Sequence, residues 1–369
     1  MKTKYIHKIA QSLKANNLEA ILVTPSEELQ FIADINPYLC ERFQGLFIKQ
    51  DASCFYICNL LNADEFREIF GPEIEIFSWS DSDGFIDATR TAFTKHGLLG
   101  KTVGVNTTSR AFNVLTIMNE MDIQFCDGRY ILEAMRIIKT PEEMQALREA
   151  AAIVDDSFAE LLEYLRPGLT EAQIMEKMKD IFARQGIFEC NVLACAGANS
   201  SYPHYCGNEG VVQYGDVVLM DWGCRHKNMW SDMSRTVFIG EASPRQSEIY
   251  NIVLEAQTAA EKAAVKGAFV PDVDKTARDI ITAKGYGDAF ITRLGHGIGY
   301  SLHEGPSIVQ TNHINLDTGM AFSIEPGIYL AGELGVRIED IVLIGPNGTE
   351  ILNQAPKELI VVPAPKGKE

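Results

Sequence analysis

The chain has 369 residues, of which 46% are hydrophobic and 22% are charged, and its formal net charge is -17. This length favours two domains with buried cores, and the acidic excess argues against nucleic acid and anionic membranes, which attract basic proteins. No apolar stretch reaches the roughly 18 residues of a membrane span, and the first residues lack the apolar core of a signal peptide. We therefore expect a cytoplasmic protein whose partners include neither nucleic acid nor membrane.

The N-terminal third of the chain alternates between helical and strand-like patterns. A helix is predicted over residues 5–16. Short apolar runs rich in branched and aromatic side chains predict strands over residues 20–24, 45–48, 53–57 and 101–105. This order predicts a small α/β domain over residues 1–135, in which no motif with evident chemistry is found.

A second domain is predicted over residues 136–369. Thr140 can cap a helix, Pro141 suits its first position and Glu143 completes a capping box, so a long helix should begin here. Another helix start lies at Thr170. Beyond it we expect strands over about 190–240, helices over 244–266 and 271–284, strands to about 362, and a frayed tail over 363–369.

Eight cysteines are scattered through the chain without a C-x-x-C pair. In a large chain without an export signal, this pattern predicts reduced, mostly buried thiols. It does not favour a zinc–thiolate site.

A first pair of acids lies in a predicted hairpin. Asp221 interrupts one apolar strand, and Asp232 interrupts the next. If the polar turn between them centres on His226 and Lys227, the two carboxylates face each other across the ladder. Opposed like charges destabilise a sheet and buried charge needs a partner, so a cation is expected between them.

A second pair follows the same logic. Glu325 and Glu339 lie in two apolar runs, and a loop centred on Gly332 would place them opposite each other. One such pair could arise by chance or share a proton, whereas two pairs in one domain favour metal. Three other acids lie at strand or turn edges and are interpreted as structural: Asp216, Asp317 and Asp340.

One histidine, His296, lies among three glycines, which permit close approach of the backbone. Imidazole suits transition metals and zinc, so we predict that His296 is a fifth ligand. Two divalent ions would cancel the four carboxylate charges, and such pairs typically lie about 3.5–4 Å apart around a bridging water or hydroxide. The oxygen-rich set suits manganese, cobalt or iron, and indicates a binuclear hydrolase without naming its substrate.

Together these motifs resemble the pita-bread metallopeptidases, in particular the prolidase and aminopeptidase P branch. The resemblance covers roughly residues 138–362 and rests on residues 216–236, 295–299, 303–306, 324–327 and 336–340. It implies an α+β fold, in which a pseudo-symmetric pita-bread domain with a curved antiparallel sheet follows a smaller α/β domain of the creatinase N-terminal type.

The resemblance also implies a role for each metal ligand. Asp221 would bind one ion, Asp232 and Glu339 would bridge both, and His296 and Glu325 would bind the other. The implied cofactors are two divalent ions, with Mn2+ as the first choice and Co2+, Fe2+ or Zn2+ as alternatives. Members of this family are commonly homodimers.

Three further residues are predicted to take part in catalysis. His204 and His303, ambiguous on their own, correspond to histidines that bind substrate and handle protons, and Arg337 could orient a carboxylate or the substrate. Trp222 and Cys224 replace the commoner phenylalanine and alanine after the first aspartate, and these positions lie beside a predicted ligand, not at one.

The implied activity is hydrolysis of the Xaa-Pro bond in dipeptides or short peptides by a metal-bridging hydroxide. The short interval between Glu325 and Glu339 resembles compact prolidases more than methionine aminopeptidases. Two alternatives stay open. One is a creatinase-like hydrolase or lyase acting on a small non-peptide substrate. The other is a binding module without catalysis, which predicts missing ligands, whereas none is missing here.

Overall fold

The structure, a computed structural model, describes residues 1–365 and divides into two compact units, Met1–Arg136 and Ile137–Glu369. The last four residues of the predicted frayed tail lie outside the described part. No helix within residues 1–365 is long and apolar enough to cross a membrane.

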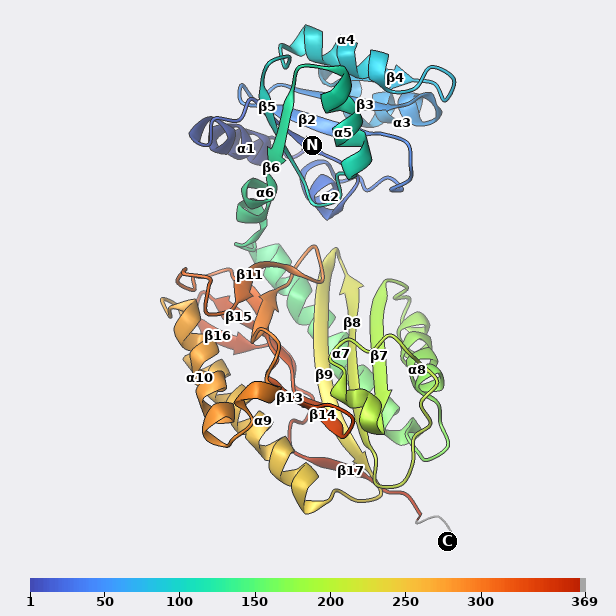
Figure 1. Ribbon diagram of the computed structural model, residues 1–369, viewed down its shortest axis with the longest axis vertical. Helices are drawn as coiled ribbons and strands as arrows, with labels where there is room; N and C mark the ends of the chain where they lie inside the picture. The colour runs from blue at the N-terminus through green and yellow to red at the C-terminus, as the bar shows by residue number, and fades with distance from the viewer. Residues whose placement is uncertain (366–369) are drawn as a thin grey trace. The chain divides into compact units, whose positions relative to one another are not determined.

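The first unit is built on one mixed sheet of six strands in the order β4-β3-β2-β1-β5-β6 (Figure 1). The strands are β1 (Ala20–Val23), β2 (Gly45–Lys49), β3 (Cys54–Asn59), β4 (Glu75–Trp79), β5 (Thr102–Val105) and β6 (Gln124–Asp127). The helices are α1 (Thr3–Ala15), α2 (Glu27–Ala33), α3 (Leu60–Phe70), α4 (Ile86–His96), α5 (Ala111–Glu120) and α6 (Arg129–Arg136). The helix and the four strands predicted for this part of the chain are all present.

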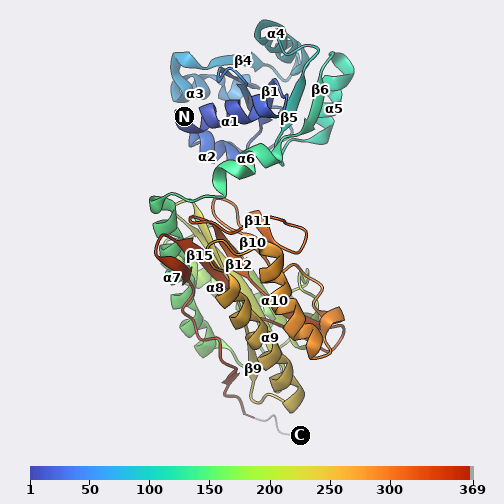
Figure 2. The same cartoon turned by 90° about the vertical axis from the view of Figure 1, so that its left-hand side faces the viewer.

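The second unit consists of two helix-covered sheets and a separate two-stranded ribbon. The first sheet has the order β17-β9-β8-β7, the second has the order β11-β10-β12-β15-β16, and the ribbon pairs β13 with β14. Helices α7 (Pro141–Tyr164) and α8 (Glu171–Arg184) pack on the first sheet, and α9 (Pro244–Ala263) and α10 (Val270–Ala283) pack on the second (Figures 1 and 2). The strands are β7 (Cys190–Ala196), β8 (Val217–His226), β9 (Met229–Ile239), β10 (Gly295–Gly297), β11 (Glu304–Ile308), β12 (Ala321–Ile324), β13 (Gly327–Leu330), β14 (Leu334–Arg337), β15 (Asp340–Gly345), β16 (Gly348–Ile351) and β17 (Ile360–Val362).

Local sequence explains where the long helix α7 begins. The Thr140 hydroxyl accepts a hydrogen bond from the Glu143 backbone N–H, and the Glu143 carboxylate accepts one from the Thr140 backbone N–H. This confirms the predicted capping box, which satisfies two backbone donors that a helix leaves without intrahelical partners. Trp222 of β8 then packs against Phe158 of α7, with ring centroids 5.6 Å apart, and fixes the helix on the sheet.

The register predicted for the first hairpin is wrong. Asp221 pairs with Ser234, and Asp232 pairs with Gly223, because the turn consists of Lys227 and Asn228. Both turn residues have positive φ, 48° and 67°, as a tight two-residue hairpin turn requires, and asparagine favours such a turn. The shift is two residues, so both carboxylates still project from the same face of the sheet.

The register predicted for the second hairpin is confirmed, although the hairpin is broken. Strands β12 and β15 pair with Ile324 opposite Asp340, and β13 and β14 continue the same register with Gly327 opposite Arg337. Glu325 and Glu339 lie between the two ladders. Pro326, the residue after Glu325, has no N–H to donate to a ladder hydrogen bond. The break leaves both acids level with each other beside the first sheet.

Candidate metal centre

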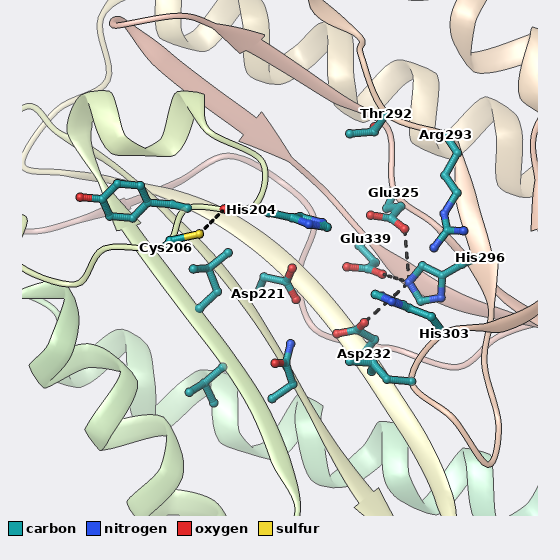
Figure 3. A pocket seen from close by; sticks show the side chains of 15 residues that line it. His204, Cys206, Asp221, Asp232, Thr292, Arg293, His296, His303, Glu325 and Glu339 are labelled. Atoms are coloured by element: carbon teal, nitrogen blue, oxygen red, sulfur yellow. Dashed lines mark hydrogen bonds and ion pairs between the residues drawn. The ribbon is translucent and has the colours of Figure 1, made fainter. Parts of the chain in front are cut away.

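A pocket of about 590 Å³ in the second unit collects most of the residues that the sequence marked (Figure 3). Asp221 and Asp232 come from β8 and β9, and His296 comes from β10. The remaining candidates that line it are His204, His303, Glu325 and Glu339. Apolar residues alternate with Asp221 along β8 and pack under α7 and α8, so strand alternation points this carboxylate into the pocket.

The five expected ligands form two overlapping groups. Asp221, Asp232 and Glu339 each offer an oxygen within 4.8 Å of the others, and His296, Glu325 and Glu339 do the same. The Nε2 atom of His296 lies 3.3 Å from Glu325 Oε1 and 3.8 Å from Asp232 Oδ2. Glu339 belongs to both groups, as the bridging position implied by the family resemblance requires.

The donor set fits two divalent cations. Three carboxylate oxygens are buried without a hydrogen-bond partner: Asp221 Oδ1, Asp232 Oδ1 and Glu339 Oε1. Such atoms cost free energy unless a ligand satisfies them. Burial, reinforced by the neighbouring carboxylates, raises the pKa of Asp232 and of Glu339 well above the usual range. A bound cation would reverse this effect by stabilising the charged forms.

The tautomer of His296 is suited to coordination. Its Nδ1 atom lies 3.1 Å from the Gly297 carbonyl oxygen, which can only accept, so Nδ1 carries the proton. Its Nε2 lone pair therefore faces the carboxylates. Burial lowers the pKa of this imidazole to about 4, which keeps it neutral and able to bind metal near neutral pH.

Arg337 does not line the pocket, but it contacts side chains that belong to the site. Its Nη2 atom donates to Asp221 Oδ2 at 2.5 Å, and its Nε atom donates to the Ser234 hydroxyl at 2.8 Å. That hydroxyl in turn donates to Glu339 Oε2 at 2.7 Å. Arg337 and Ser234 thus hold two of the candidate ligands in place, and the part played by Ser234 was not predicted.

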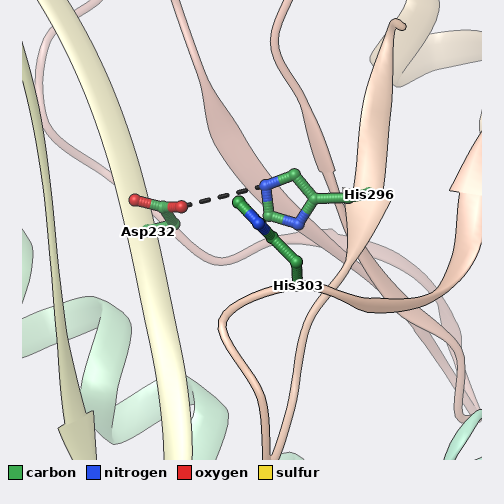
Figure 4. Close-up of side chains that lie close together, drawn as sticks. All are labelled: Asp232, His296 and His303. Carbon is green, nitrogen blue, oxygen red and sulfur yellow. Dashed lines mark ion pairs between the residues drawn. The ribbon is translucent and has the colours of Figure 1, made fainter. Parts of the chain in front are cut away.

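The two other histidines occupy different positions. The His303 ring packs against His296 with ring centroids 4.2 Å apart, and its nitrogen comes close enough to form a further group with Asp232 and His296 (Figure 4). Burial lowers the pKa of His303 to about 4, and the neighbouring His296 is the second largest cause of this shift. The imidazole of His303 is therefore neutral near pH 7. His204 is exposed and points into the pocket from the loop between β7 and β8 (Figure 3).

One charged residue of the pocket was missed by sequence reasoning. Arg293 lines it beside Thr292 and His303, and its positive charge contributes to lowering the pKa of His303. Its position three residues before His296 was the one sequence feature that could have indicated a place in the pocket. A single arginine near a histidine does not form a recognisable motif, so it was not selected. Its guanidinium group brings a positive charge to the pocket lining and can face an anionic part of a bound molecule.

Two family models match most of the chain. The one described as Metallopeptidase family M24 covers residues 145–346, and the one described as Creatinase/Prolidase N-terminal domain covers residues 6–138. Both agree with the resemblance drawn from the motifs and with an α/β domain followed by an α+β pita-bread domain.

Known proteins resemble the chain along nearly its whole length. An Xaa-Pro dipeptidase of Lactobacillus helveticus is 33% identical over 97% of this chain and 99% of its own length. The crystal structure of a prolidase from Thermococcus sibiricus superposes with a TM-score of 0.91 at 31% identity, covering 98% of this chain and 99% of its own. Dipeptidase PepE from Mycobacterium ulcerans superposes with a TM-score of 0.90 at 30% identity over 98% and 97% of the two chains.

Proposed function

The chain belongs to metallopeptidase family M24, in its prolidase branch, and on that premise we propose that it hydrolyses the Xaa-Pro bond of dipeptides or short peptides with two bound divalent ions. The observation that carries the proposal is the convergence of four carboxylates and one imidazole in two groups that share Glu339. A non-catalytic module would have no reason to keep this complete set of buried charges, which are costly without a cation.

Five residues would hold the ions: Asp221, Asp232, His296, Glu325 and Glu339. Oxygen atoms dominate this set and thiols are absent from it, so manganese is our first choice, with cobalt, iron or zinc as alternatives. When bound, such ions activate a water molecule and polarise the carbonyl group that it attacks.

The other residues would position the substrate and handle protons. An Xaa-Pro bond has no N–H, so the site needs no acceptor for one, but the leaving proline nitrogen must gain a proton. The neutral imidazole of His303 stands beside the ligands and can donate or accept that proton. His204 would contact the substrate from the loop, and Arg337 would hold the Asp221 carboxylate.

Substrate choice is tested with the purified, manganese-loaded protein on matched peptides. We expect an Xaa-Pro dipeptide to be cleaved roughly 10-fold or more faster than the Xaa-Ala dipeptide with the same first residue, because pocket shape commonly discriminates by that much. Chelator should abolish cleavage, and added manganese should restore it. An Xaa-Pro-containing tripeptide distinguishes a dipeptidase from an aminopeptidase.

Equal rates on the two dipeptides would contradict specificity for proline, but they would still be consistent with a metallopeptidase. If the metal-loaded protein cleaved no peptide but hydrolysed creatine or a similar guanidino compound, the peptidase proposal would be wrong.

We also propose the roles of the two domains, the oligomeric state and the location of the protein. Residues 136–369 would form the catalytic domain and residues 1–135 an accessory domain of a homodimer, as the resemblance to the family implies. We propose that this homodimer is cytoplasmic. Light scattering of the purified protein should give twice the chain mass of 40.9 kDa. A monomeric mass together with full activity would rule out a required dimer.

A further inference from the structure

Two cysteines of the first sheet in the second unit are paired directly across neighbouring strands. Cys190 at the start of β7 is the register partner of Cys224 on β8, and both are free thiols. The other strand cysteines of the described chain face different residue types: Cys54, Cys58, Cys126 and Cys195 pair with isoleucine, serine, glycine and leucine. Among the strand cysteines that the structure describes, Cys190 and Cys224 alone are register partners of each other.

The hydrogen-bond pattern shows which kind of pair this is. The next pair along the ladder is Glu189 with Arg225, and the Arg225 backbone N–H donates to the Glu189 carbonyl oxygen at 2.9 Å. Hydrogen-bonded and non-hydrogen-bonded pairs alternate in an antiparallel ladder, so Cys190 and Cys224 form a non-hydrogen-bonded pair. In such a pair the Cα atoms lie about 4.5 Å apart and the side chains approach most closely, within the roughly 4.4–6.8 Å range of a disulfide.

Both thiols project from the same face of the sheet. Cys224 is fully buried in the core under α7, with its Sγ atom 4.0 Å from the Ala150 carbonyl oxygen, and Cys190 packs against the same core with partial exposure. Asp221 and the pocket lie on the opposite face. A reagent in solvent can thus reach Cys190 first, and the buried Cys224 is the neighbouring thiol that can react with the modified Cys190.

We propose that Cys190 and Cys224 are a redox-modification site, which a small disulfide such as oxidised glutathione converts to a reversible intramolecular disulfide bond. The Cys190 thiolate attacks one sulfur of the oxidant, breaks its S–S bond and releases one thiol. Cys224 then loses its proton and attacks the Cys190 sulfur, releasing the second thiol. The two cysteines lose two electrons and two protons, which reduce one oxidant disulfide to two thiols.

The bond would close a ring that contains β7, the His204 loop and β8 as far as Cys224, and so includes Asp221. A closed ring restricts the unfolded chain and stabilises the folded one. Burial raises the pKa of both thiols, that of Cys224 to about 12. Because the thiolate is the reactive form, oxidation should be slow at neutral pH and faster at mildly alkaline pH. These properties fit a slow stabilising response to oxidising conditions.

The test uses the full-length protein with oxidised glutathione at mildly alkaline pH. Free thiols should fall from eight to six, and non-reducing peptide mapping should find Cys190 joined to Cys224. The unfolding temperature should rise by roughly 5 °C, and a dithiol reductant should reverse both changes. Cys190→Ser and Cys224→Ser should each abolish the rise, whereas Cys126→Ser, which changes a half-buried cysteine of the other unit, should keep it.

Three outcomes would overturn the proposal. These are eight remaining thiols after prolonged oxidation of the native protein, a persistent glutathione adduct on Cys190 without a bond to Cys224, and a disulfide mapped to Cys195 and Cys206. Peptide mapping of the wild-type chain decides between these outcomes even if a serine variant fails to fold.

Discussion

Asp232→Ala should lose its bound metal and, with it, hydrolytic activity. Asp232 is only 4% exposed and belongs to the groups formed with Asp221 and Glu339 and with His296. Its removal would take an anionic ligand that both ions are expected to share, and would leave three carboxylates, with a total charge of -3, to balance the +4 of two divalent ions. We expect metal affinity to fall by more than the roughly 10–100-fold that loss of an outer-shell partner costs, and turnover to fall in proportion.

Elemental analysis of the purified variant measures this directly. Asp317→Ala is a matched control, since Asp317 is an exposed acid of the same unit that pairs with Lys266 away from the pocket, and it should keep two equivalents. Two equivalents retained by Asp232→Ala would refute the bridging role.

His303→Ala should keep both ions and its fold while turnover falls by roughly 10²–10⁴-fold, the usual cost of removing a positioned proton-transfer group. In the structure the His303 ring packs directly against His296, one of the candidate ligands. The structure also indicates the protonation state in which His303 begins the reaction. Because the pKa of His303 is lowered to about 4, the resting side chain is neutral and acts by accepting or donating a proton within the reaction.

The metal content of this variant separates two roles, since His303 also lies within ligand distance of Asp232 and His296. Loss of metal in parallel with activity would make His303 a ligand, and near-normal turnover would remove it from catalysis. His313→Ala, which changes an exposed histidine of the same unit that packs near Phe269, is the control and should leave both quantities unchanged.

Sequence patterns predicted the second hairpin better than the first for a physical reason. Gly332 and a symmetrical apolar pattern fixed the register around Glu325 and Glu339. In the first hairpin four polar residues could form the turn, and only the positive φ of Lys227 and Asn228 shows which two do. The two-residue error preserved the strand faces, so the prediction that both acids share one site did not depend on the exact register.

Other features depended on contacts between segments far apart in the chain. Ser234 links Arg337 to Glu339 only because β9 and the end of β14 meet, and no local pattern marks a serine for such a task. The charge of Arg293 in the pocket depends likewise on how the loop before β10 folds over the site. Register and alternation are encoded locally, whereas the residues that support the ligands are decided by tertiary packing.

The need for two ions can be measured as the rate of Xaa-Pro hydrolysis during titration of the metal-free protein with manganese. The shared position of Glu339 between two ligand groups predicts that full activity requires both ions, so the rate should rise until two equivalents per chain are bound and then level off. A rate that reaches its plateau at one equivalent, or hydrolysis by the metal-free protein, would contradict a mechanism that requires two ions.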